Sequence, residues 1–92
     1  MSGLGRQRTE MKIMEIVVGM FQNSAEYDQK RVINTGTRIR DELGFDSVML
    51  IVLQIDIEDA FQIRFDPAQE DLQQIFTSVR TLTDYVQSHI GE

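Results

Sequence analysis

The stretch SVMLIVLQIDIEDAFQ, from residue 47 to about residue 62, constrains the fold most, because its apolar residues recur at the spacing of an α-helix. Steps of three and four residues return to the same side of a helix, so this stretch has one continuous apolar face that belongs in a core. That face comprises Leu50, Leu53, Ile57 and Phe61.

The opposite side of the same predicted helix is also apolar over its first two turns and becomes acidic further along. Such a helix is either buried on both sides or presents a docking patch, and burial on both sides is hard to arrange in a bundle of 92 residues. We therefore predict a partner-docking surface on this side. It comprises Val48, Met49, Ile51, Val52, Ile55, Asp56, Glu58 and Asp59.

The rest of the chain predicts further helices and no strand, because no stretch alternates convincingly with period two. Apolar spacing indicates a first helix over about residues 8–21 and a last helix that Ser78 caps. Between them we expect a helical turn that Thr37 caps and Gly44 ends, and a short apolar turn at LQQIF. The expected fold is all-α, a small bundle of three main helices and one short helix.

The length of 92 residues suits one small domain, which we expect to span residues 1–92, with about 8–88 structured and frayed ends. The chain has no cysteine, so neither disulfides nor thiolate metal sites are available. It has no apolar run of about 18 residues and no secretory h-region, which predicts a cytoplasmic protein without a membrane span. We expect a monomer.

The negative charge is concentrated in the second half of the chain. Residues 41–92 contain eleven acidic residues against Arg64 and Arg80 alone, a net charge of −9. This charge repels phosphate backbones, so nucleic acid is not an expected partner. It attracts basic protein surfaces, although an acidic surface that only keeps the protein soluble is an equal alternative.

The sequence does not describe an enzyme. A serine nucleophile needs a nearby base, and the only histidine, His89, fits an ordinary surface position near the C-terminus. Asp56, Glu58 and Asp59 share a helix but are not part of a calcium loop, and the glycines form no phosphate-binding fingerprint. We predict no catalytic residue and no metal site.

Ser47, within DELGFDSVML, has two interpretations. Serine is a favoured N-cap, and on composition alone Ser47 is a cap for the helix that follows. The apolar surface around it favours the second interpretation, in which Ser47 is an attachment point that partner enzymes approach. An unmodified helical adaptor, in which the same surface binds a protein permanently, is a rival from another class.

LGFDSV followed by an apolar helix resembles the acyl carrier protein family, whose signature is an Asp-Ser-Leu at the start of the second helix. The similarity covers about residues 39–86, with weaker agreement in the first helix. The matching positions are Leu43, Gly44, Asp46, Ser47, Phe61 and the segments FTSV and DYV (residues 76–79 and 84–86).

The resemblance implies a carrier whose serine, here Ser47 with Asp46 as its motif neighbour, receives 4′-phosphopantetheine from coenzyme A. A phosphopantetheinyl transferase performs that reaction, and acyl groups then travel as thioesters between acyl-loading and acyl-processing enzymes with basic or apolar docking patches. A helix N-terminus favours a nearby phosphodiester, and the absent cysteine agrees with a thiol that arrives on the prosthetic arm.

The chain departs from the family in two places. Many members have acids two and five residues after the serine, where this chain has Met49 and Val52. The link to the closing segment, around PAQEDLQQ, is also longer than usual. These differences favour a dedicated carrier for fatty-acid-like or polyketide cargo over a housekeeping fatty-acid carrier, with an aminoacyl or peptidyl carrier as the alternative.

Overall fold

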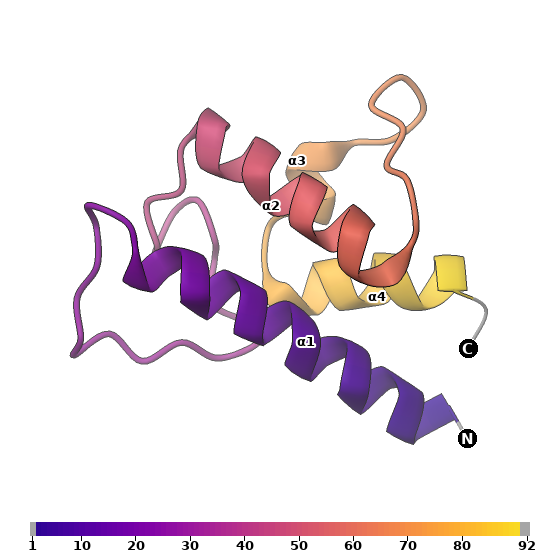
Figure 1. Cartoon of the computed structure of the whole chain (residues 1–92), viewed down its shortest axis with the longest axis horizontal. Helices are drawn as coiled ribbons and strands as arrows, with labels where there is room; N and C mark the ends of the chain where they lie inside the picture. Colours follow the sequence, from indigo (N-terminus) through magenta and orange to yellow (C-terminus); the bar gives the residue numbers. More distant parts are fainter. Residues whose placement is uncertain (1, 91–92) are drawn as a thin grey trace.

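The computed structural model describes residues 2–90, with side chains from residue 5. The sequence predicted order over about residues 8–88, and residues 1, 91 and 92 of the ends expected to fray lie outside the described range. Within it the chain forms four helices and no strand, so the all-α prediction is confirmed (Figure 1). The helices are α1 (Ser2–Gln22), α2 (Ser47–Phe61), α3 (Leu72–Ile75) and α4 (Val79–Ile90).

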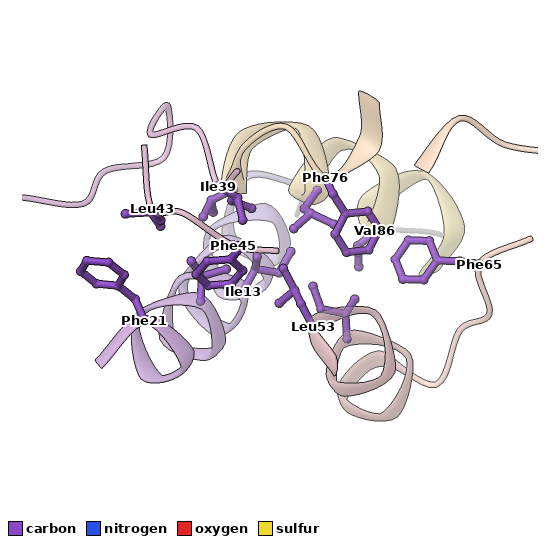
Figure 2. Packing of buried hydrophobic residues seen from close by; sticks show 13 residues of the cluster. Ile13, Phe21, Ile39, Leu43, Phe45, Leu53, Phe65, Phe76 and Val86 are labelled. Atoms are coloured by element: carbon purple, nitrogen blue, oxygen red, sulfur yellow. The ribbon is translucent and has the colours of Figure 1, made fainter. Parts of the chain in front are cut away.

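The core lies where α1, α2 and α4 meet, since α1 packs against both of the other long helices (Figures 1 and 2). Helical spacing explains which side chains enter it, because each helix buries the residues of one face. Helix α1 contributes Ile13 and Val17, and α2 contributes Leu53 and Ile57. The remaining buried apolar residues come from α1, α4 and the loops: Phe21, Ile39, Leu43, Phe45, Phe65, Phe76, Val79, Leu82 and Val86.

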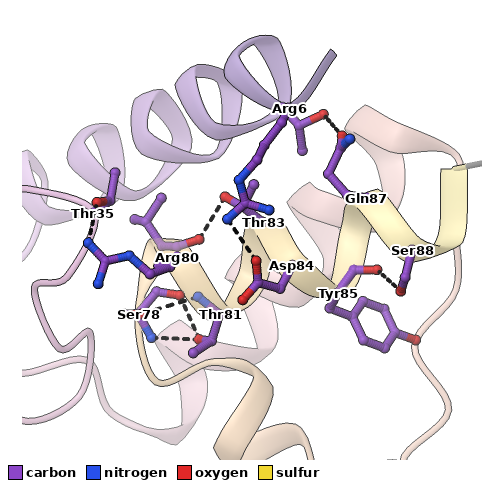
Figure 3. Close-up of polar contacts among 12 residues, drawn as sticks. Arg6, Thr35, Ser78, Arg80, Thr81, Thr83, Asp84, Tyr85, Gln87 and Ser88 are labelled. Atoms are coloured by element: carbon purple, nitrogen blue, oxygen red, sulfur yellow. Dashed lines mark hydrogen bonds and ion pairs between the residues drawn. The ribbon is translucent and has the colours of Figure 1, made fainter. Parts of the chain in front are cut away.

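Helix α1 begins at Ser2, not near residue 8 as the apolar spacing predicted. Two contacts with α4 account for the extra turns. Arg6 forms an ion pair with Asp84 at 2.7 Å, and the Thr9 hydroxyl donates to Gln87 Oε1 at 2.6 Å (Figure 3). These contacts join distant parts of the sequence, so the local pattern of apolar residues does not reveal them.

Helix α4 has the cap that the sequence predicted. The Ser78 hydroxyl accepts from the Thr81 N–H at 3.2 Å, and the Thr81 hydroxyl accepts from the Ser78 N–H at 3.0 Å (Figure 3). This reciprocal pair is a capping box that satisfies two otherwise free donors. It fixes the direction in which α4 leaves the loop.

The long connection between α1 and α2 is held by the start of α4. Ile39 is buried and donates its N–H to the Thr77 carbonyl at 2.9 Å, while the Arg80 N–H donates to the Thr35 carbonyl at 2.9 Å. The expected helical turn forms as a turn over residues 39–43 and does not extend into a helix. Thr37 does not cap it. Thr37 instead accepts from the Asn34 N–H at 2.9 Å, because its side chain is turned into the structure and buried.

The long link after α2 forms a closed turn fastened to α4. Glu70 accepts from the Asp66 N–H at 2.8 Å and from the Tyr85 hydroxyl at 2.7 Å. The Tyr85 ring stacks on Phe65 on one side, with centroids 4.9 Å apart, and on His89 on the other, at 4.0 Å. The additional residues of this link therefore end in an ordered anchor on α4.

Candidate functional site

Helix α2 begins at Ser47, directly after the segment LGFD, and its N-cap is Asp46. The Asp46 backbone is extended (φ −90°, ψ −177°), and its carboxylate accepts from the Met49 N–H at 2.9 Å. Ser47 is therefore the first residue of the helix and not its cap. Asp and Ser are both good caps, and the backbone places Asp46 in the capping position here.

Gly44 gives the segment before Ser47 its shape. It has φ +73°, a left-handed conformation that favours glycine, and a Cβ at this position would lie 2.8 Å from Glu26 Cγ. Leu43 and Phe45 on either side are both buried in the core (Figure 2). The two buried neighbours and the glycine turn fix the path of the chain immediately before Ser47.

The Ser47 side chain is exposed, and within residues 2–90 its hydroxyl has no hydrogen-bond partner. Three other serines of this range, Ser24, Ser78 and Ser88, form hydrogen bonds through their hydroxyls to nearby residues. Ser24 Oγ donates to the Phe21 carbonyl and Ser88 Oγ to the Tyr85 carbonyl, both at 2.8 Å. Because Asp46 provides the cap, the Ser47 hydroxyl remains available for chemistry.

A pocket of about 240 Å³ lies beside Ser47, between α2 and α3. Its apolar lining comes from Leu50, Ile51, Leu72 and Phe76. Its polar lining comes from Ser47, Arg40, Gln54 and Gln73, and no acidic residue is among the residues that line it. Sequence analysis did not find this pocket, because its walls come from three separate segments.

The predicted docking face of α2 is uncovered. Val48 is 67% exposed and Ile55 is 56% exposed, and Ile51 and Val52 are exposed as well. Met49 differs from these four, because it is half-buried and packs against the core. The prediction of an exposed apolar surface is confirmed for the four Val and Ile side chains.

The three acids of the docking surface differ in their environments. Asp56 and Asp59 are exposed. The Glu58 carboxylate accepts from the Phe65 N–H at 2.9 Å, so it is engaged in holding the link that follows α2. Asp56 also borders a groove of about 620 Å³ between α1 and α2, whose rim includes Glu15 and Glu26.

Residues that could support independent chemistry do not gather around Ser47. His89 is exposed at the end of α4, where Nε2 lies 3.7 Å from Glu70 Oε2 and Nδ1 lies 2.8 Å from the Tyr85 carbonyl. Within residues 2–90 no group of three His, Cys, Asp or Glu side chains is placed to hold a metal ion. In the same range no helix is both long enough and apolar enough to span a membrane.

An exposed, unpartnered serine at the start of a helix with an uncovered apolar face, in a small helical bundle, is the arrangement of a carrier domain. The model of the family described as "Phosphopantetheine attachment site" matches residues 15–86. The chain belongs to this family, so it is a carrier protein and not a catalyst, and its cofactor is covalent 4′-phosphopantetheine. No solved structure matches the chain.

Proposed function

We propose that Ser47 is the residue to which 4′-phosphopantetheine is attached, and that the thiol of this arm carries acyl intermediates as thioesters. The observation that carries the proposal is the exposed Ser47 hydroxyl, which makes no hydrogen bond within the described residues because Asp46 caps α2 in its place. The site fits the group. The N-terminal turn of α2 favours a phosphodiester, and the adjacent pocket has both polar and apolar walls.

In the attachment reaction, the Ser47 oxygen attacks the β-phosphorus of coenzyme A. An oxygen–phosphorus bond to Ser47 forms, the bond to 3′,5′-ADP breaks, and the hydroxyl proton passes to a base on the transferase. The carrier supplies an accessible hydroxyl and a rigid segment that presents it. The metal ion and the positioning of coenzyme A belong to the transferase, as positioning and charge stabilisation account for most of phosphoryl-transfer catalysis.

We further propose that the exposed side of α2 is the surface on which partner enzymes dock. Val48, Ile51, Val52 and Ile55 form its apolar part, next to Ser47. Burial of this surface stabilises a complex by roughly 25 cal/mol per Å² of apolar area. Asp56 and Asp59 lie further along and favour partners with basic patches. The family favours this carrier function over an unmodified adaptor.

The cargo we propose is an acyl group of fatty-acid-like or polyketide type. The support is the resemblance of LGFDSV to the acyl carrier protein signature. Met49 and Val52, in place of the acids that such carriers commonly have, favour a dedicated carrier of either type over a housekeeping fatty-acid carrier. An aminoacyl or peptidyl cargo is the alternative. Mass spectrometry of the protein isolated from its own host decides between them, because an amino acid on the arm would support the alternative.

The attachment residue is tested by intact mass. The protein is incubated with coenzyme A, Mg²⁺ and a broad-specificity phosphopantetheinyl transferase, and the wild type is expected to gain one phosphopantetheine. Ser47→Ala should gain none, whereas the matched control Ser88→Ala should gain one. Modification of Ser24, Ser78 or Ser88, located by fragmentation of the loaded protein, would contradict the assignment.

A further inference from the structure

The side chain of Arg40 lies at the pocket beside Ser47 and forms none of the polar contacts that hold the described part of the fold together. Its side chain is exposed, lines the same pocket as Ser47, and within residues 2–90 forms neither a hydrogen bond nor an ion pair. Arg38 contrasts with it, because the Arg38 guanidinium lies 3.9 Å from the Asp41 carboxylate and does not line this pocket. Arg40 is therefore a cation whose charge is available next to the serine.

The backbone beneath Arg40 is held firmly. Ile39, the preceding residue, is fully buried and bonds to Thr77, and the Arg40 carbonyl accepts from the Gly44 N–H at 3.1 Å. The guanidinium is therefore tethered close to the pocket even though the side chain itself is exposed. The other residues that line the pocket belong to residues 41–92, a part of the chain with a net charge of −9.

We propose that the Arg40 guanidinium binds the phosphodiester that joins the prosthetic arm to Ser47, and so directs the arm toward the pocket between α2 and α3. This inference rests on the attachment of the arm to Ser47. A phosphodiester placed there adds a negative charge beside the Asp46 carboxylate, and Arg40 is the basic residue that lines the pocket. A guanidinium recognises phosphate oxygens through two parallel N–H donors, which gives direction as well as attraction.

The test compares holo proteins by ³¹P NMR of the phosphodiester. The variants are Arg40→Gln, Arg40→Lys and the matched control Arg38→Gln, each loaded with coenzyme A and a transferase and confirmed by intact mass. The phosphorus resonance should shift in Arg40→Gln relative to wild type and stay in place in Arg38→Gln. Arg40→Lys should give a smaller shift than Arg40→Gln, because it keeps the charge and loses the paired donors.

A second measurement observes the arginine directly. In ¹H–¹⁵N spectra, the Arg40 Nε–Hε signal should move between the apo and holo wild-type proteins, the Arg38 signal should not, and salt should reduce the movement. An unshifted phosphorus resonance in loaded Arg40→Gln would overturn the inference. This also holds if the variant loads slowly, because an arginine that contacts only the transferase would slow loading without shifting that resonance. A failure of Ser47 itself to accept the arm would overturn the proposed function instead.

Discussion

Over its first two turns α2 is apolar on both faces, yet the two faces lie in opposite environments. Leu53 and Ile57 are fully buried in the core, while Val48 is 67% exposed and Ile55 56% exposed on the other side. Among the apolar residues of this helix, residue type therefore does not distinguish core from exposed surface, and position around the helix does. An uncovered apolar face that begins beside the exposed Ser47 is typical of a surface that other proteins bury.

The largest expected effect separates the two faces by stability. Leu53→Ala removes a fully buried side chain and should lower the free energy of unfolding by roughly 2–5 kcal/mol. Ile55→Ala, on the exposed face, should change it by less than about 0.5 kcal/mol. Urea denaturation followed by circular dichroism measures both. Similar midpoints for the two variants would show that the faces are wrongly assigned.

Leu53→Ala and Ile55→Ala should rank in the opposite order when the rate of loading by a partner enzyme is measured. Ile55→Ala should slow loading by the cognate partner enzyme, because its side chain lies on the surface proposed for docking. Met11→Ala, which truncates a 71% exposed apolar side chain on α1, provides a control of similar size for surface changes. Loading rates are measured by intact mass over time, and an unchanged rate in Ile55→Ala would remove Ile55 from the docking surface.

A smaller loss of stability is expected at Asp46, the N-cap at which α2 and its two faces begin. Asp46→Ala removes the acceptor for the Met49 N–H and should lower the free energy of unfolding by about 1 kcal/mol. Asp46→Asn should retain most of this stability, because an asparagine oxygen can accept the same bond. Thermal denaturation measures both, and equal losses in the two variants would show that the charge of Asp46, and not its bond to Met49, stabilises the helix.

The smallest expected effect is a pH dependence at the link that follows α2. The hydrogen bond from the Tyr85 hydroxyl, followed by that from the Asp66 N–H, holds the pKa of Glu70 below its ordinary value of 4.5. Because the folded protein lowers this pKa, the contribution to stability is present above pH 4.5 and is lost as the pH falls below it. Nearby His89 acts in the same direction.

Tyr85→Phe should therefore weaken the loss of stability below pH 4.5 without changing how partners load Ser47. At the other end of the scale, burial and the bond to Glu70 raise the pKa of Tyr85, so this contribution is present below pH 10.0 and is lost as the pH rises past that value. Thermal denaturation midpoints measured across the pH range test both the acid-side and the alkaline-side loss of stability. Parallel curves for wild type and Tyr85→Phe would contradict this account.

The sequence indicated the range of α2 well because its strong apolar periodicity lies within one segment. Its predicted range ended near Gln62 and the helix ends at Phe61, where Gln62 takes a left-handed conformation. Leu50 and Phe61, however, are half-buried and not fully buried, since they lie toward the edge of the packed face. Local pattern gives the face of a helix more reliably than the depth of each side chain.

The features that the sequence did not reveal depend on contacts between distant segments. The choice of Asp46 over Ser47 as the cap is set by the path that Leu43 and Phe45 impose when they enter the core. The pocket beside Ser47 brings Arg40 next to Gln73, which comes much later in the chain. An arginine in a loop has no periodicity that would mark such a position.

Helix α3 has a mechanical consequence for the pocket that it borders. It is a single turn, Leu72–Ile75, with no buried residue, and it is fastened by the Asp71 cap and by the Thr81 hydroxyl, which donates to the Ile75 carbonyl at 2.7 Å. Elements with so little burial open locally at a small fraction of the global unfolding free energy. The amide hydrogens of α3 should therefore exchange with solvent faster than those at the centre of α2, which gives the pocket one rigid wall and one compliant wall.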